Sequence, residues 1–293
     1  RAFGNTLRLR EEASDAWGFG WLDDAVQDVR FALRTLRHSP GFALTAVATL
    51  ALGIGVNSGM FSVVNGLLLR PLYERPDEVV GVRSRSTTPS RDARGLSYPN
   101  YVDLREGTTD IFAVLAATST RFVGLDAGAG ARRAMVSGVT ANYFQIFRQP
   151  LALGRPFTTD EARPGADDRV AIISYRLWEQ RATDPRVLGQ GVRVNGEPFT
   201  VVGVAAKGFT GTGIPGPEVW LPIGAQDAIN SGAGADARRT SARDAHELDV
   251  VGRLHAGVPV ERVGPALDTI ARRLEQAFPA INGGYTLVAG APF

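Results

Sequence analysis

The feature that most constrains the fold of this chain is a long run without a charged residue. It spans residues 42–69 and reads FALTAVATLALGIGVNSGMFSVVNGLLL. About 20 apolar residues, each rising about 1.5 Å along a helix, cross the hydrocarbon core of a bilayer. A buried helix of a soluble protein is the alternative, but such helices rarely run so long without a charge. A cleavable signal peptide fits less well, because the run starts far inside the chain and exceeds the apolar region of such peptides. The sequence therefore predicts one transmembrane helix over residues 42–69.

Two glycines inside this run, Gly55 and Gly59, are spaced four residues apart. Small residues at this spacing let a second helix approach closely, so the pair predicts a transmembrane packing face. Glycine is also commoner in membrane helices than in soluble ones, which is an equally good explanation of the pair.

The segment before the run, WLDDAVQDVRFALRTLRHSPG, predicts an amphipathic helix that ends at Pro40-Gly41. Its acidic residues come early and its arginines late, which matches the helix dipole. A basic amphipathic helix beside a span is expected to lie among lipid headgroups, anchored by tryptophan; packing on another protein surface is the alternative. The expected interfacial residues are Trp21, Leu22, Val26, Val29, Leu33 and Leu36 on the apolar stripe, with Arg30, Arg34 and Arg37 beside it.

Charge and residue types exclude several functions for this chain. The 32 Lys+Arg residues nearly balance 30 Asp+Glu residues, giving a net charge of +2, so we expect no nucleic-acid partner. Cysteine is absent, which excludes disulfides and thiolate metal sites. Lys207 is the only lysine and follows Ala205-Ala206, so the sequence has no phosphate-binding P-loop. We therefore expect this chain to bind no cofactor.

Residues 70–293 alternate short strand and helix patterns, which predicts an α+β domain. Asn195-Gly196 between two apolar alternations predicts a tight hairpin. Strands are expected at residues 79–82, 112–118, 170–173, 248–254 and 285–289, and helices at residues 97–105, 175–181 and from Pro265 to about Phe278, the last forming a β-α-β unit with the two final strands.

Three patterns suggest chemistry, and each has a plainer explanation. GTGIPG at residues 211–216 matches a dinucleotide fingerprint, but its prolines forbid a helix there, which favours a surface loop. His246, Glu247, Asp249 and His255 are close in sequence, but strand alternation separates them, so we expect no metal site. The acid pairs at 160–161 and 167–168 lie in a Gly/Pro-rich stretch and are expected to be solvated, so we predict no catalytic residues.

Several segments in order resemble a known family, the MacB/FtsX-type ABC transporter permeases. The resemblance covers most of residues 22–289. The opening FGNTLRLREEASDAWGFGWLDD is similar to a duplicated subfamily found without an adjacent ATPase gene. The matching segments are residues 28–72 (the elbow helix and first span), LSYPNYVDLRE, VSGVTANYFQIFRQPLALGRPFT, VAIISYRLWEQR, LGQGVRVNGEPFTVVGVAAKGFTG, VWLPIG and VVGRLHAGV.

The resemblance implies a bacterial inner-membrane permease subunit that carries ATP-driven motion to an extracytoplasmic domain for export or efflux. Its implied partners are a separate ABC ATPase, a second copy in a homodimer, and a periplasmic adaptor or outer-membrane protein. It also implies two subdomains, one similar to the porter modules of tripartite pumps and one smaller inserted α/β unit at about 110–225. Further transmembrane helices are expected beyond residue 293.

These expectations divide the chain into a cytoplasmic lead-in and elbow helix (1–41), a transmembrane helix (42–69) and an extracytoplasmic domain (70–293). The orientation follows from the family and the long following domain, because arginines flank both ends of the span. The rival hypothesis is an FtsX-type anchored module that controls a partner such as a cell-wall hydrolase. An anchored extracytoplasmic enzyme is a third possibility.

Overall fold

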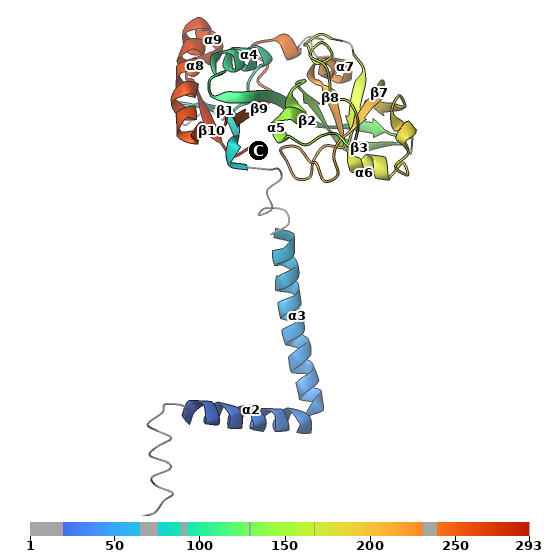
Figure 1. Cartoon of the computed structure of the whole chain (residues 1–293), viewed down its shortest axis with the longest axis vertical. Coiled ribbons are helices and arrows are strands. Elements are labelled where there is room, and N and C mark those ends of the chain that lie inside the picture. The colour runs from blue at the N-terminus through green and yellow to red at the C-terminus, as the bar shows by residue number, and fades with distance from the viewer. Residues whose placement is uncertain are drawn as a thin grey trace, which may run out of the picture. The chain divides into compact units, whose positions relative to one another are not determined.

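The computed structural model describes residues 20–64, 76–88, 93–128, 130–166, 168–230 and 239–292. The chain divides into two compact units, Arg1–Arg70 and Pro71–Phe293 (Figure 1).

The first unit contains two helices, α2 (Gly20–His38) and α3 (Pro40–Val64). They are separated only by Ser39, whose carbonyl accepts a hydrogen bond from the amide of Ala43. In the part of the chain that the structure describes, α3 is the one helix long and apolar enough to cross a membrane, over Pro40–Ser62. None of that window is buried, and side chains such as Leu50 remain exposed. The predicted helix is thus confirmed through Val64, while residues 65–69 lie outside the described residues.

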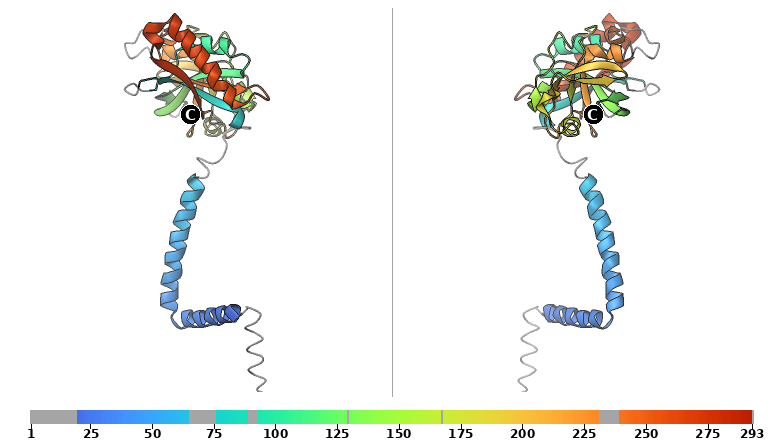
Figure 2. Two further views of the ribbon diagram at one scale, coloured as in Figure 1. Left: turned by 90° about the vertical axis from the view of Figure 1, so that its left-hand side faces the viewer. Right: turned by 90° about the vertical axis from the view of Figure 1, so that its right-hand side faces the viewer.

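In the second unit, four antiparallel strands form a sheet in the order β10-β1-β9-β2. Two helices cover one face of this sheet, and Figure 2 shows α8 running along β10. Because the chain order is β1-α4-β2 and then β9-α8-β10, the arrangement is a split βαβ pair of units. The elements are β1 (Val79–Ser86), α4 (Tyr98–Gly107), β2 (Phe112–Asp126), β9 (Asp249–Leu254), α8 (Val263–Ala277) and β10 (Tyr285–Gly290).

The chain between β2 and β9 builds a mixed six-strand barrel. The ring runs β2-β3-β8-β5-β7-β6 and closes where Leu125 of β2 pairs with Val194 of β6. The β3–β8 and β5–β7 pairs are parallel and the others antiparallel. Its strands are β3 (Ala131–Val139), β5 (Val170–Ile173), β6 (Gly191–Val194), β7 (Glu197–Val204) and β8 (Val219–Pro222), with β4 (Leu153–Gly154) outside on β7.

β2 belongs to both parts of this unit. Its first half, up to Thr118, pairs with β9, whereas residues from Thr118 to Asp126 pair with β3 in the barrel. The sheet and the barrel therefore share one hydrogen-bonded framework. The subdomain limits at about 110 and 225 remain a prediction.

Short helices connect the strands. They are α5 (Tyr143–Phe147), α6 (Tyr175–Glu179), α7 (Gln226–Asn230), α9 (Pro279–Asn282), and the 3-10 turns η2 (Pro76–Glu78), η3 (Pro185–Val187), η4 (Ile223–Ala225), η6 (Arg239–Ser241) and η7 (Val260–Arg262).

Strand alternation gives the domain three apolar clusters. Val80 and Val82 of β1 face α4 and α8 in the first cluster, and the second fills the barrel. Val79 faces the opposite side, where the third cluster gathers the aromatic side chains of α5 with Phe209 and Trp220.

The strand at residues 170–173, the Asn195-Gly196 hairpin and the final β-α-β unit are confirmed. The expected start of a helix at Pro265 is wrong, because α8 begins at Val263 after η7. Proline is tolerated there since first-turn amides have no acceptor within the helix. The insert was expected to be an α/β unit, but its strands close into a barrel with only short helices.

Candidate membrane helices and the groove beside α5

The amphipathic segment is helical as predicted, within α2. Val26, Val29 and Leu36 are exposed on one stripe, and Arg30, Arg34 and Arg37 are exposed beside it. Phe31 is also exposed and falls on the far side of the helix at about 100° per residue, a feature that the sequence reading missed. The side chains of Trp21, Leu22 and Leu33 lie outside the described residues. Lipid binding by this stripe stays a prediction.

The two glycines of the predicted packing face lie in the middle of α3. A Cβ added to Gly55 or Gly59 would meet no described atom within 4 Å. There is accordingly room for another helix to approach, and the packing face stays a prediction.

In the domain, a surface groove of about 530 Å³ lies beside α5 and the segment that follows it. Apolar side chains form most of its lining, with an arginine and amide groups among them. The lining includes Phe144, Gln145, Arg148, Leu151, Gly154 and Pro156. A cleft of this size is typical of sites that take a small molecule or a partner's side chains.

Aromatic packing fixes α5 at this position. The ring of Phe144 lies 5.8 Å from that of Trp220, and the ring of Phe147 lies 5.1 Å from that of Phe209. Complete burial raises the pKa of the neighbouring Tyr143 to about 12, so this phenol stays neutral. The helix ends at Phe147, and the next residue, Arg148, has a left-handed backbone with a φ of 53°.

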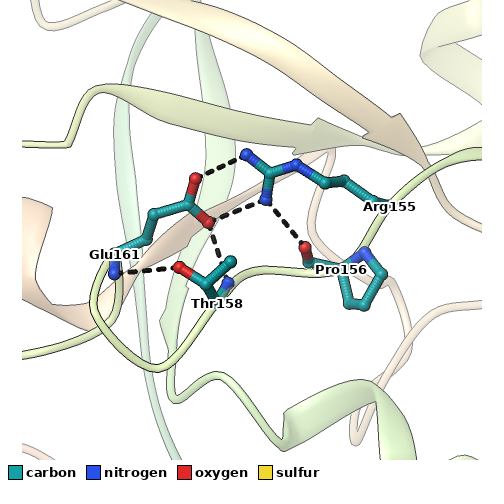
Figure 3. A network of polar contacts seen from close by, with 4 residues as sticks. All are labelled: Arg155, Pro156, Thr158 and Glu161. Atoms are coloured by element: carbon teal, nitrogen blue, oxygen red, sulfur yellow. Dashed lines mark hydrogen bonds and ion pairs between the residues drawn. The ribbon is translucent and has the colours of Figure 1, made fainter.

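One wall of the groove is fixed by a polar network (Figure 3). The guanidinium of Arg155 donates two hydrogen bonds to the Glu161 carboxylate, at 2.6 and 2.9 Å. Thr158 and Glu161 also bond to each other's backbone amides, at 2.8 and 3.2 Å, as in a helix capping box. The hydrogen bonds from Arg155 hold the pKa of Glu161 below its usual value. The network fixes the turn that follows Gly154 and Pro156.

Replacing Glu161 by glutamine is expected to lower the free energy of unfolding by about 1–2 kcal/mol at pH 7, because one partner of a charged pair is lost. A carboxylate with a lowered pKa stabilises the fold above its unfolded-state pKa of about 4.3, and this contribution disappears as pH falls through the folded-state pKa. The gap between the two proteins should therefore narrow below about pH 4. Urea unfolding of the whole chain in detergent at both pH values would measure it.

The control is Glu179→Gln, since Glu179 pairs across 3.7 Å with Lys207 and both side chains are largely exposed. That variant should lose less than about 1 kcal/mol. If both variants lost the same free energy of unfolding, the Arg155 network would stabilise the fold no more than an exposed ion pair does.

The other candidate residues fall in different surroundings. The loop 211–216 leads into β8 and not into a helix. Glu247 pairs with Arg121, the His255 ring lies 3.0 Å from the carbonyl oxygen of Thr109, and burial lowers the pKa of His246 to about 4. Among the described residues, no group of three or more His, Cys, Asp or Glu could hold a metal ion. Of the two acid pairs, Glu161 is bound by Arg155 in the network described above, whereas Asp167 lies outside the described residues.

Known proteins share this fold and part of this sequence. Two relatives, the macrolide export ATP-binding/permease proteins MacB of Burkholderia pseudomallei strains 1710b and K96243, are 24% identical over 276 residues, or 89% of this chain. The chain spans 40% of their length, and no ATPase domain is evident in it.

Solved structures agree on the fold. The periplasmic region of MacB from Actinobacillus actinomycetemcomitans superposes with a TM-score of 0.53 at 13% identity, over 76% of this chain and 94% of that one. A domain of a permease from Porphyromonas gingivalis gives 0.51 at 16% identity, over 76% and 92% of the two chains.

Residues 43–270, most of this chain, match the family described as the MacB-like periplasmic core domain. The match covers most of α3, the strands β1, β2 and β9 with α4 and the first part of α8, and the barrel; β10 lies beyond it. The chain therefore belongs to the MacB-like periplasmic core domain family of MacB/FtsX-type ABC permeases.

Proposed function

We propose that this chain is part of a permease subunit of an ABC transporter in a bacterial inner membrane. In this proposal, ATP-driven motion passes through α3 to the extracytoplasmic domain and drives export or efflux. The observation that carries the proposal is the exposed, uncharged α3 preceding a domain of this family. The porter-like role of the sheet and the separate role of the barrel belong to the same proposal.

The proposed partners are a separate ABC ATPase chain, a second copy of the permease, and a periplasmic adaptor or outer-membrane protein. Lys207, the only lysine of the sequence, is exposed and pairs with Glu179 on the surface, so it forms no phosphate-binding loop in this domain. The relatives' names combine ATP binding with a permease, so an ATPase acts with such domains there.

We propose that α2 lies among the lipid headgroups and that Gly55 and Gly59 pack against another transmembrane helix. Replacing both glycines by leucine should reduce assembly of the native protein in membranes, because branched side chains keep backbones apart. The measurement is the fraction of crosslinked assembly in membranes. Leucine at Ala46 and Gly53, on the opposite side of the helix at about 100° per residue, is the control. Full assembly of the Gly55/Gly59 variant would remove the packing face from the proposal.

Spin labels test the transport proposal directly. Residues 1–293 contain no cysteine, so Arg186→Cys on the exposed surface of η3 provides the label, with any cysteine elsewhere in the native protein replaced by serine. In host membranes holding the full native protein and its ATPase, we expect a defined distance between the labels of two copies. We also expect that distance to shift when ATP and vanadate are added. If the distance between the labels were the same with and without ATP and vanadate, the transport role would be contradicted.

The groove beside α5 favours a second candidate, the FtsX-type module anchored by α3 that binds and controls a partner. Under this alternative α3 serves only as an anchor, so the labels would report no nucleotide-driven change, while a partner protein such as a cell-wall hydrolase would bind the groove. The same labelled protein therefore separates the two functions.

A further inference from the structure

The chain enters the extracytoplasmic domain beside a carboxylate that two distant arginines contact. Glu78 ends η2, directly before β1, and its Oε2 accepts a hydrogen bond from Nη1 of Arg253 at 2.7 Å. The same oxygen lies 3.7 Å from Nη1 of Arg148. The side chains of Glu78 and Arg253 are only 16% and 2% exposed. Glu78 is thus fixed to β9 and to the end of α5 at the point where the chain arrives from α3.

Arg253 joins three elements through one rigid group. Besides its bond to Glu78, its Nε donates a hydrogen bond to the carbonyl oxygen of Ile146 in α5, at 2.5 Å. A guanidinium is planar, so the two bonds hold their acceptors at a fixed separation. A displacement of η2 would therefore pull on Arg253 and, through it, on the last turn of α5.

Arg148 extends this connection to the groove. It lines the groove and reaches Glu78, although its φ of 53° lies in the left-handed region where glycine is the usual residue. Glycine would satisfy the backbone at the end of α5 but could contact neither the groove nor Glu78. We therefore attribute the presence of arginine at this position to the contacts of its side chain.

We propose that Glu78, held by Arg253 and Arg148, is the attachment point that transfers displacement of the chain arriving from α3 to α5 and to the groove. The inference rests on the proposed function, because it assumes that α3 moves. Coupling of this kind is reciprocal, so a molecule bound in the groove would also bias the position of the entering chain.

The test uses a cysteine in the groove of the full native protein, in host membranes that contain its ATPase. Gln145→Cys provides the thiol, and its rate of reaction with a membrane-impermeant maleimide is measured without nucleotide and with ATP plus vanadate. We expect the rate to change about fivefold or more in the otherwise unaltered chain. Adding either Glu78→Gln or Arg148→Gly should abolish that change.

Ala182→Gly is the matched control, because Ala182 is likewise a left-handed non-glycine residue, with a φ of 58°, and lies in the turn after α6. Both glycine variants should keep or raise the thermal midpoint of unfolding, because glycine adopts the left-handed backbone conformation without the strain that arginine or alanine has there. Loss of the response in Arg148→Gly but not in Ala182→Gly then reports lost coupling and not unfolding. An equal response in all variants would overturn the proposal.

Hydrogen exchange makes the test independent of transport. Without nucleotide, the amides of residues 78–82 should exchange about fivefold faster in Glu78→Gln and Arg148→Gly than in the unaltered chain or in Ala182→Gly. If the unaltered chain shows no nucleotide response, the transport role fails, and faster exchange still supports the attachment. Unchanged exchange in both variants would overturn the attachment whatever the transport result.

Discussion

Replacing Leu50 and Ile54 of α3 by arginine is expected to release the chain from membranes. Both positions lie near the middle of Pro40–Ser62, where each arginine costs about 2.5–3.5 kcal/mol on the insertion scale. Together they would lower insertion by about a thousandfold or more, at about 1.4 kcal/mol per tenfold. The measurement is the share of chain that stays in the membrane pellet after alkaline carbonate, which removes proteins held only at the surface. A chain starting at Leu72 should be recovered without detergent.

The control places arginine at Phe42 and Ala43, near the end of the span, where long side chains reach the headgroups at little cost. That variant should resist carbonate like the unaltered chain. Resistance of the Leu50/Ile54 variant would show that something other than α3 holds the chain in the membrane, and the proposed path of motion would lose its first step.

Replacing Trp220 by alanine is expected to reduce the free energy of unfolding by about 3–5 kcal/mol, because a fully buried indole leaves a cavity. Trp220 lies on β8 of the barrel, and its ring contacts those of Phe144 and Phe209 at 5.8 and 5.4 Å. Its loss should also loosen α5. Urea unfolding of the whole chain in detergent, followed by circular dichroism, would give the difference.

Trp178→Ala is the matched control, since Trp178 on α6 is only partly buried and lies outside the aromatic cluster. We expect that variant to lose distinctly less stability than Trp220→Ala. A loss below about 1 kcal/mol for Trp220→Ala would contradict the view that this cluster fixes α5.

Elements with a local signal could be predicted from the sequence. The apolar run at residues 170–173 became β5, and Asn195-Gly196 supplied the positive φ angles of 51° and 85° that the β6–β7 turn requires. The uncharged run became α3, and the family could be recognised from several short segments in order.

Elements that depend on distant pairing could not be predicted. The second half of β2 begins with the polar residues Ser119, Thr120 and Arg121, which interrupt its apolar pattern; it continues as a strand because β3 and β6 pair with it. The Glu78–Arg253 bond joins residues 175 positions apart, and no spacing in the sequence indicates it. The left-handed Arg148 was equally hidden, because glycine or asparagine is the usual marker of that conformation. The candidate groove and its connections therefore became visible only in the fold.

The shared strand β2 has a mechanical consequence. Its 15 residues, at about 3.3 Å each, form a strand about 50 Å long that pairs with β9 in its first half and with β3 in its second half. Bending at Thr118 would break backbone hydrogen bonds on both sides at once, so a hinge is disfavoured there. A tilt of the first half of β2 would consequently be passed on to its second half, and with it to the barrel strands β3 and β6.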